Sequence, residues 1–138
     1  MDADDTGVVA EISTSMQQVL DHLVERIPGV IGALVSSADG FTLASHVPSN
    51  TLIEPASLGA MSAAALALSD RLVTTVGVST SAATVHRSAD GQVLVLPIER
   101  LAVLTILATP DTDTDRLTLV GREATSGLER LFRGAASV

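Results

Sequence analysis

The sequence has no cysteine, no lysine, no tryptophan and no tyrosine, and its phenylalanines are Phe41 and Phe132 alone. The absence of cysteine excludes disulfides, thiol nucleophiles and thiolate metal sites. The absence of lysine excludes the usual P-loop, whose lysine reaches the nucleotide phosphates. So few aromatic rings leave little surface on which nucleic-acid bases or flat cofactors can stack. The composition therefore argues against thiol enzymes, P-loop nucleotide-binding proteins and nucleic-acid-binding proteins that stack bases on aromatic rings.

The charge balance of the chain is strongly acidic. The formal net charge is −8 over 138 residues, and a chain of this sign repels nucleic-acid phosphates and anionic lipid headgroups on average. The sequence starts M-D-A-D-D, which is acidic where a signal peptide is basic and then apolar. Its uncharged stretches are too short or too polar to span a bilayer. We expect a cytoplasmic protein with no nucleic-acid partner and no membrane insertion.

Hydrophobic residues make up 46% of the chain, which is enough for one core of ordinary size. With so few aromatics, that core must consist of leucine, valine, isoleucine and alanine. The first residues lack apolar periodicity. We predict a flexible acidic tail over residues 1–10, a single domain over residues 11–133, and a second flexible tail over residues 134–138.

Two terminal segments have the apolar periodicity of amphipathic helices. The first begins at Glu11, carries one apolar stripe, and is stopped by Pro28 and Gly29. The last ends near Phe132, and Thr112 and Asp115 have the spacing of a capping box at its start.

A third and longer helix is predicted over about residues 55–76, with Pro55 at its first turn, where proline is tolerated. It is apolar nearly all round, which predicts neighbours on two sides. Its large and small apolar side chains form separate faces: Leu58, Met61, Ala65, Leu68, Leu72 and Val76 on one, and Ala56, Gly59, Ala60, Ala63, Ala64 and Ala67 on the other.

Five segments read as strands because they are rich in aliphatic and β-branched residues and are bounded by turn residues. They cover residues 30–36, 41–46, 78–87, 92–98 and 101–109. The element order is then α-β-β-α-β-β-β-α, and we predict an α/β fold of the α+β sandwich type. Its five-stranded antiparallel sheet would carry the long middle helix on one face and the terminal helices on the other.

The tetrapeptide S-A-D-G occurs twice, each time between two predicted strands. We expect the serine to accept a hydrogen bond and the glycine to adopt the positive φ that follows a type I turn. The residues assigned to the two hairpin turns are Asp39, Gly40, Asp90 and Gly91.

Other motifs carry little chemistry. D-T-D-T-D at residues 111–115 fails the calcium-loop pattern, because Arg116 and Arg122 stand where glycine and glutamate are required. The three histidines are scattered, and no nucleophile-elbow sequence is present. Arg100, at the tip between two strands, fits an arginine finger, although a solvated tip arginine is the commoner case. We predict no enzyme activity, no metal and no cofactor.

The stretch R-I-P-G-V-I-G-A-L-V-S-S-A-D-G-F-T-L-A-S resembles the start of the roadblock/dynein light-chain domain family, and the element order matches as well. The matching positions are Ile27, Gly29, Val30, Gly32, Ala33, Asp39 and Gly40. The resemblance implies a non-enzymatic homodimer that binds a small Ras-like GTPase, as a scaffold or as an activator. It also implies a bacterial, actinobacterial signalling module that contains a sensor kinase-like protein.

In this family, dimers join the third strands edge to edge and pack the long middle helices together. The third predicted strand here lacks proline, lysine and glycine, so nothing protects it as a free edge about 33 Å long. The predicted dimer interface comprises Val78, Ser79, Thr80, Ser81, Ala82, Ala83, Thr84 and Val85 of that strand, and Ala60, Ala63, Ala64 and Ala67 of the middle helix.

The GTPase surface is predicted on polar positions that border the small-residue face: Ser57, Ser62, Ser69, Asp70 and Arg71. Two other functions stay open. The layout also suits a small-molecule sensor domain of the profilin, PAS or GAF type, which would need a concave pocket with convergent polar groups. A purely structural scaffold without a GTPase is the third possibility.

Overall fold

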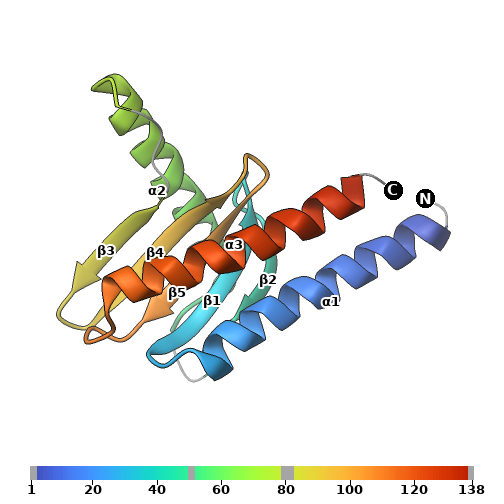
Figure 1. Ribbon diagram of the computed structural model, residues 1–138, viewed down its shortest axis with the longest axis horizontal. Helices are drawn as coiled ribbons and strands as arrows, with labels where there is room; N and C mark the ends of the chain where they lie inside the picture. The colour runs from blue at the N-terminus through green and yellow to red at the C-terminus, as the bar shows by residue number, and fades with distance from the viewer. Residues whose placement is uncertain (1–2, 50–51, 79–82, 137–138) are drawn as a thin grey trace.

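The computed structural model describes residues 3–49, 52–78 and 83–136 and contains three helices and five strands. In chain order the elements are α1 Ala3–Arg26, β1 Val30–Ser37, β2 Thr42–His46, α2 Pro55–Thr75, β3 Thr84–Ser88, β4 Gly91–Ile98, β5 Ala102–Ala108 and α3 Thr114–Ala136 (Figure 1).

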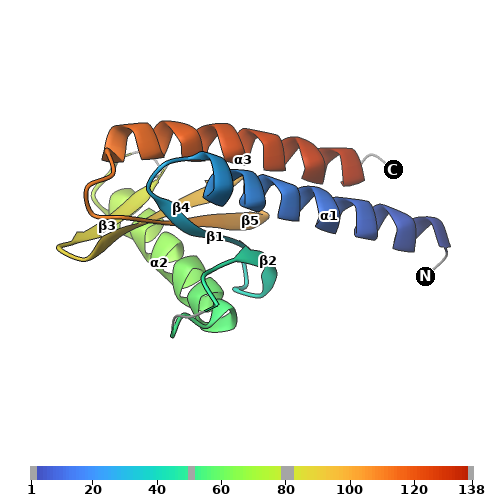
Figure 2. The ribbon, with the colours of Figure 1, turned by 90° about the horizontal axis from the view of Figure 1, so that it is seen from below.

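The strands form one antiparallel sheet in the order β2-β1-β5-β4-β3. Figure 2 shows α2 on one face of the sheet and α1 and α3 on the other. The predicted element order, antiparallel sheet and helix placement are thus confirmed. A strand whose two faces are both covered is a nearly continuous apolar run. The central strand β5 is such a strand, because all of its residues are buried.

The larger part of the core lies between the sheet and the α1–α3 layer. Alternate residues of β4 and β5, such as Leu94, Leu96 and Leu104, point to this side and meet Leu20 and Leu128 of the helices. The side that faces α2 is smaller: its described apolar cluster holds Ala63, Leu66, Val95 and Val103. The two faces of the sheet are therefore covered very unequally.

Both terminal helices extend beyond the predicted limits. Helix α1 begins at Ala3, where the sequence predicted a flexible tail to residue 10, and α3 continues past Phe132 to Ala136. In both views the ends of α1 and α3 project past the sheet, with the two termini on the same side (Figures 1 and 2). The parts of α1 and α3 that project past the sheet have no core to contact and so need no apolar stripe. They stay helical because adding a residue to an existing helix costs little free energy once the helix is nucleated.

The third strand is shorter than predicted. Strand β3 covers Thr84–Ser88, so Val78 and Ala83 lie outside it, and residues 79–82 lie outside the described residues. Helix α2 ends near Val76, and Gly77 follows with φ +82°. The prediction of one strand from residue 78 was wrong at Val78, because β-branched composition alone does not supply a pairing partner.

The two S-A-D-G turns differ. In the first, Gly40 has φ +94° and the Phe41 amide donates to Ser37 Oγ at 3.1 Å, as predicted. In the second, Ser88 Oγ accepts from the Asp90 amide at 3.2 Å, but Gly91 has no positive φ and pairs with Ser88 as the first residue of β4. The prediction of one shared geometry was therefore wrong for Gly91.

The start of α3 also differs from its prediction. Asp113 Oδ1 accepts from the amides of Asp115 and Arg116, at 2.9 and 3.1 Å. Asp113 is therefore the capping residue, and the expected capping box between Thr112 and Asp115 is absent. The Thr112 hydroxyl instead pairs with Thr109 Oγ1 at 2.7 Å.

Candidate interaction surface

Helix α2 exposes its large apolar side chains. Met61, Leu68 and Leu72 are 62%, 69% and 65% exposed, and Val76 extends the row at the end of the helix. They are separated by seven, four and four positions, which places them on one face of the helix. Because no described element covers this row, it forms an exposed apolar stripe, which we call the α2 stripe: Met61, Leu68, Leu72 and Val76.

The opposite side of α2 carries small residues and touches the sheet. Its buried members are Gly59, Ser62, Ala63 and Leu66. The helix approaches the first hairpin so closely that a Cβ on Gly59 would lie 2.8 Å from Thr42 Oγ1 and 3.3 Å from the Gly40 carbonyl oxygen. Gly59 and Ala63 therefore allow close helix–sheet packing, and the large side chains of the α2 stripe face outward.

This orientation changes the predicted helix part of the dimer interface. Ala60, Ala64 and Ala67 are exposed, as that prediction needs, but Ala63 is buried against Val95 and Val103. Ala63 is therefore not available to a partner. The small-residue face spans too wide an arc to point in one direction, so two of its six members, Gly59 and Ala63, meet the sheet and the other four are exposed.

The five residues predicted for the GTPase surface do not share one environment. Ser57 and Arg71 are exposed, whereas Ser69 and Asp70 are half-buried. Ser62 is 3% exposed and lies beneath the helix, so its assignment to a surface was wrong. On a helix, residues 62 and 69 also lie on the inner side with 59, 63 and 66, which explains their burial.

The two edges of the sheet are unequal. On the β2 edge, Gln17 Nε2 of α1 donates to the Ser45 carbonyl at 3.0 Å, and the pairing of β2 with β1 is irregular between Val35 and Ser36. Bulges and covering elements blunt an edge strand. At the β3 edge, all residues after Thr84 are exposed, including Val85. The β3 edge lies on the side of the sheet where Val78 and the end of α2 are also exposed.

A polar cluster holds α1 against β2. His46 Nδ1 lies 2.8 Å from Asp21 Oδ1, and Gln17 Nε2 donates to the same oxygen at 3.0 Å. The hydrogen bond from Gln17, followed by that from His46, lowers the pKa of the Asp21 carboxyl from its ordinary value of 3.8. This cluster joins two elements and lies on neither the α2 stripe nor the β3 edge.

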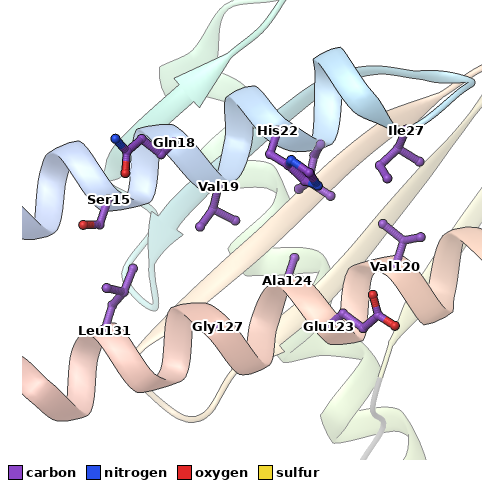
Figure 3. A pocket seen from close by; sticks show the side chains of 11 residues that line it. Ser15, Gln18, Val19, His22, Ile27, Val120, Glu123, Ala124, Gly127 and Leu131 are labelled. Carbon is purple, nitrogen blue, oxygen red and sulfur yellow. The ribbon is translucent and has the colours of Figure 1, made fainter.

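An open groove of about 520 Å³ runs between α1 and α3. Figure 3 shows Val19 of α1 and Val120, Ala124 and Leu131 of α3 in the space between the two helices, and the polar side chains of Ser15, His22 and Glu123 also line the groove. The groove exists because Ala124 and Gly127 are small where α3 faces α1. It is the concave feature that the sensor alternative requires.

Three further predictions concern Arg100, metal binding and membrane insertion. Arg100 is exposed at the β4–β5 tip. Within the described residues, no three histidine, aspartate or glutamate side chains come together as a metal site. No helix in that part of the chain is long and apolar enough to cross a bilayer.

The large apolar face predicted for the middle helix contains the α2 stripe, but the dimer interface was predicted on the small-residue face. The size of the side chains could have indicated the stripe, because its four large residues lie on one face of the helix. The sequence does not show which element each face of the helix packs against. Only the position of the sheet decides which face of an all-round apolar helix is covered.

Comparisons with known proteins agree on the fold. The family model described as the Roadblock/LC7 domain matches residues 16–108. The structure of MglB from Myxococcus xanthus superposes with a TM-score of 0.80 at 18% sequence identity, covering 89% of this chain and 91% of that one. A structure described as MglB with tetrameric arrangement gives 0.78 at 20% identity, covering 90% and 92%.

A Roadblock/LC7 domain from Streptomyces avermitilis gives a TM-score of 0.76 at 16% identity, covering 85% of this chain and 97% of that one. The comparison with curated proteins found no match. At identities this low, the comparisons establish a shared fold but do not identify the interface residues of this chain.

Proposed function

Since the chain belongs to the Roadblock/LC7 domain family, whose model spans residues 16–108, we propose that it is a non-enzymatic homodimeric adaptor that binds a small Ras-like GTPase. The α2 stripe is the observation that carries this proposal. A soluble domain rarely exposes a contiguous row of large apolar side chains unless another protein covers it. The match to the family model confirms the predicted resemblance to the roadblock family, and the functional consequences of that resemblance are the subject of the proposal.

A second copy of the chain fits this surface. The α2 stripe and the β3 edge are both exposed, and a two-fold axis beside them lets one patch meet its own copy. Pairing of two β3 edges extends the sheet through backbone hydrogen bonds, while two α2 stripes bury each other. Thr84 and Val85, with the exposed Ala60, Ala64 and Ala67, are the described members of the predicted interface that this arrangement uses.

Light scattering tests the dimer. The wild-type chain should have twice the monomer mass at micromolar concentration, and the double variant Leu68→Glu/Leu72→Glu should have the monomer mass, because it places charges in the α2 stripe. Leu119→Glu is the matched control, since Leu119 is an equally exposed leucine on α3. A monomeric wild-type chain, or a double variant that still dimerises, would contradict the proposed interface.

The GTPase partnership rests on the family resemblance. A scaffold or an activator needs only a complementary surface, and Ser57 and Arg71 are exposed beside the α2 stripe, whereas Asp70 lies on the inner side of the helix. The chain would act in a cytoplasmic, actinobacterial module that also contains a sensor kinase-like protein. Arg71 supplies the one basic side chain of α2, which is suited to an acidic partner residue.

The test is capture of a Ras-like GTPase from the same genome, loaded with GDP or with a GTP analogue. Binding should occur in at least one nucleotide state and should weaken about tenfold with Arg71→Glu, the loss of one charge-assisted contact. Arg116→Glu, an exposed arginine of α3, should bind as the wild type does. Lack of binding in both states would overturn the GTPase proposal and leave the dimer intact. A hydrolysis assay then separates an activator from a scaffold.

The α1–α3 groove supports a second candidate, a small-molecule sensor. Its lining is mainly apolar and includes the polar side chains of His22 and Glu123, as is common for small-molecule sites. A metabolite that raises the melting temperature should lose its effect in the variant Ala124→Leu, which fills part of the groove. A screen without any such metabolite would remove this candidate.

A further inference from the structure

Helix α2 is held to the sheet by an unusually thin contact. Its described apolar cluster on the sheet is Ala63, Leu66, Val95 and Val103, with Val93 at the border. The opposite face of the same sheet packs against α1 and α3 through a continuous leucine-rich core. Because apolar burial is the main stabilising contribution to such contacts, the apolar contribution that anchors α2 is smaller than the one that anchors α1 and α3 together.

Buried polar atoms without a partner weaken this contact further. In the described residues they are Ser36 Oγ, Asp70 Oδ1, Thr84 Oγ1 and Thr105 Oγ1. Ser36 and Thr105 are completely buried. A buried hydroxyl with no hydrogen-bond partner loses its hydration without compensation.

All four of these atoms belong to the α2–sheet contact. Thr105 is paired with Val95 and Thr84 is paired with the same valine, and residues paired across strands point to the same face. Ser36 is paired with Val103, and its Cβ lies 3.3 Å from where a Cβ on Gly59 would stand. Asp70 follows Leu66 by four residues on the inner side of α2. The α1–α3 core contains no such atom among the residues described.

From this concentration of unpaired polar atoms under one helix, we propose that α2 opens from the sheet as a unit while the strands, α1 and α3 remain folded. The close contact at Gly59 keeps the docked state specific, because only glycine fits between Thr42 and Gly40. A protein that binds α2 in its docked position therefore shifts this opening equilibrium. The proposal concerns one subunit and holds whether or not a second copy covers the α2 stripe.

Hydrogen exchange of the full-length chain, followed by mass spectrometry, tests the opening. Amides in the middle of α2, around Ala63 and Leu66, should exchange at least about tenfold faster than those of β5. The double variant Ser36→Ala/Thr105→Val removes two unpaired hydroxyls with little change of shape. It should slow α2 exchange by at least about tenfold, because even one avoided unsatisfied group represents that factor.

Thr125→Val is the matched control, because Thr125 is a buried threonine of α3 whose hydroxyl is satisfied by the Arg122 carbonyl at 2.9 Å. It should not slow exchange in α2. Equal protection of α2 and β5 in the wild type, or an unchanged α2 rate in Ser36→Ala/Thr105→Val, would overturn the proposal. Light scattering on the same samples reports the dimer separately, so failure of one proposal is distinguishable from failure of the other.

Discussion

Gly29 marks the turn between α1 and β1, and its conformation excludes other residues. It has φ +88°, and a Cβ would lie 2.0 Å from Thr112 Oγ1. We expect Gly29→Ala to lower the free energy of unfolding by about 2–4 kcal/mol, because both left-handed strain and overpacking act there. Urea unfolding monitored by circular dichroism measures the change.

Gly127 is the control for this substitution. It lies within α3, and a Cβ there would meet only Arg130 Nη2, at 3.9 Å. Gly127→Ala should raise the free energy of unfolding by about 0.5–1 kcal/mol through helix propensity. Equal destabilisation by both substitutions would show that the environment of Gly29 is not special.

Asp21 gives the chain a specific acid sensitivity. Its carboxyl has a lowered pKa in the folded state, from the Gln17 hydrogen bond first and the His46 hydrogen bond second. A lowered folded pKa means that the contribution of Asp21 to stability is complete above its ordinary pKa of 3.8 and is lost as the pH falls below it. The stability difference between wild type and Asp21→Asn should therefore shrink below that pH.

Urea midpoints measured from pH 6 down to pH 3 are the test of Asp21, and Gln17→Ala should weaken the same acid dependence by removing its main cause. A difference between wild type and Asp21→Asn that stays constant to the lowest pH would contradict the prediction.

At the scale of elements, Gln92 ties the start of α3 to the sheet. This glutamine is buried on β4, and its Nε2 donates to the carbonyls of Thr109 and Thr112, at 3.2 and 2.6 Å. Its Oε1 accepts from Thr114 Oγ1 at 2.7 Å. We expect Gln92→Met to lower the free energy of unfolding by about 2–4 kcal/mol, because it leaves these buried groups unpaired.

Gln18→Met, at an exposed position of α1, should change stability by no more than about 0.5 kcal/mol. Thermal unfolding of both variants is the measurement. A loss of stability in Gln92→Met alone indicates that the Gln92 hydrogen bonds are responsible, whereas an equal loss in Gln18→Met would indicate a general effect of methionine. The sequence showed the acidic loop before α3 but not Gln92, since its partners come from seventeen to twenty-two positions away.

Element boundaries illustrate what local patterns predict. The turn and helix-stop residues Pro28, Gly29 and Gly40 placed the first hairpin correctly, because backbone constraints of proline and glycine act locally. The start of α1 and the start of β3 were misplaced. Both depend on whether a neighbour is present: α1 continues past the sheet without needing an apolar stripe, and a β-branched run becomes a strand only where it finds a pairing partner.

At the scale of the whole molecule, the α2 stripe should make stability depend on protein concentration. If a second copy covers it, the melting temperature of the wild type should rise by about 2–5 °C for each tenfold increase in concentration. Leu68→Glu/Leu72→Glu should show no such rise. Differential scanning calorimetry at several concentrations is the measurement, and a wild-type melting temperature independent of concentration would contradict assembly through this face.

The sequence by itself determined the class of the fold, the order of its elements, the family resemblance and the lack of thiols and of a P-loop lysine, because these follow from composition, periodicity and short turn motifs. Only the tertiary structure decided which side of α2 faces the sheet, that Ser62 and Ala63 are buried, and that the two S-A-D-G turns differ. The physical reason is that an all-round apolar helix and a repeated tetrapeptide are each compatible with more than one environment. Packing against residues distant in the sequence selects one.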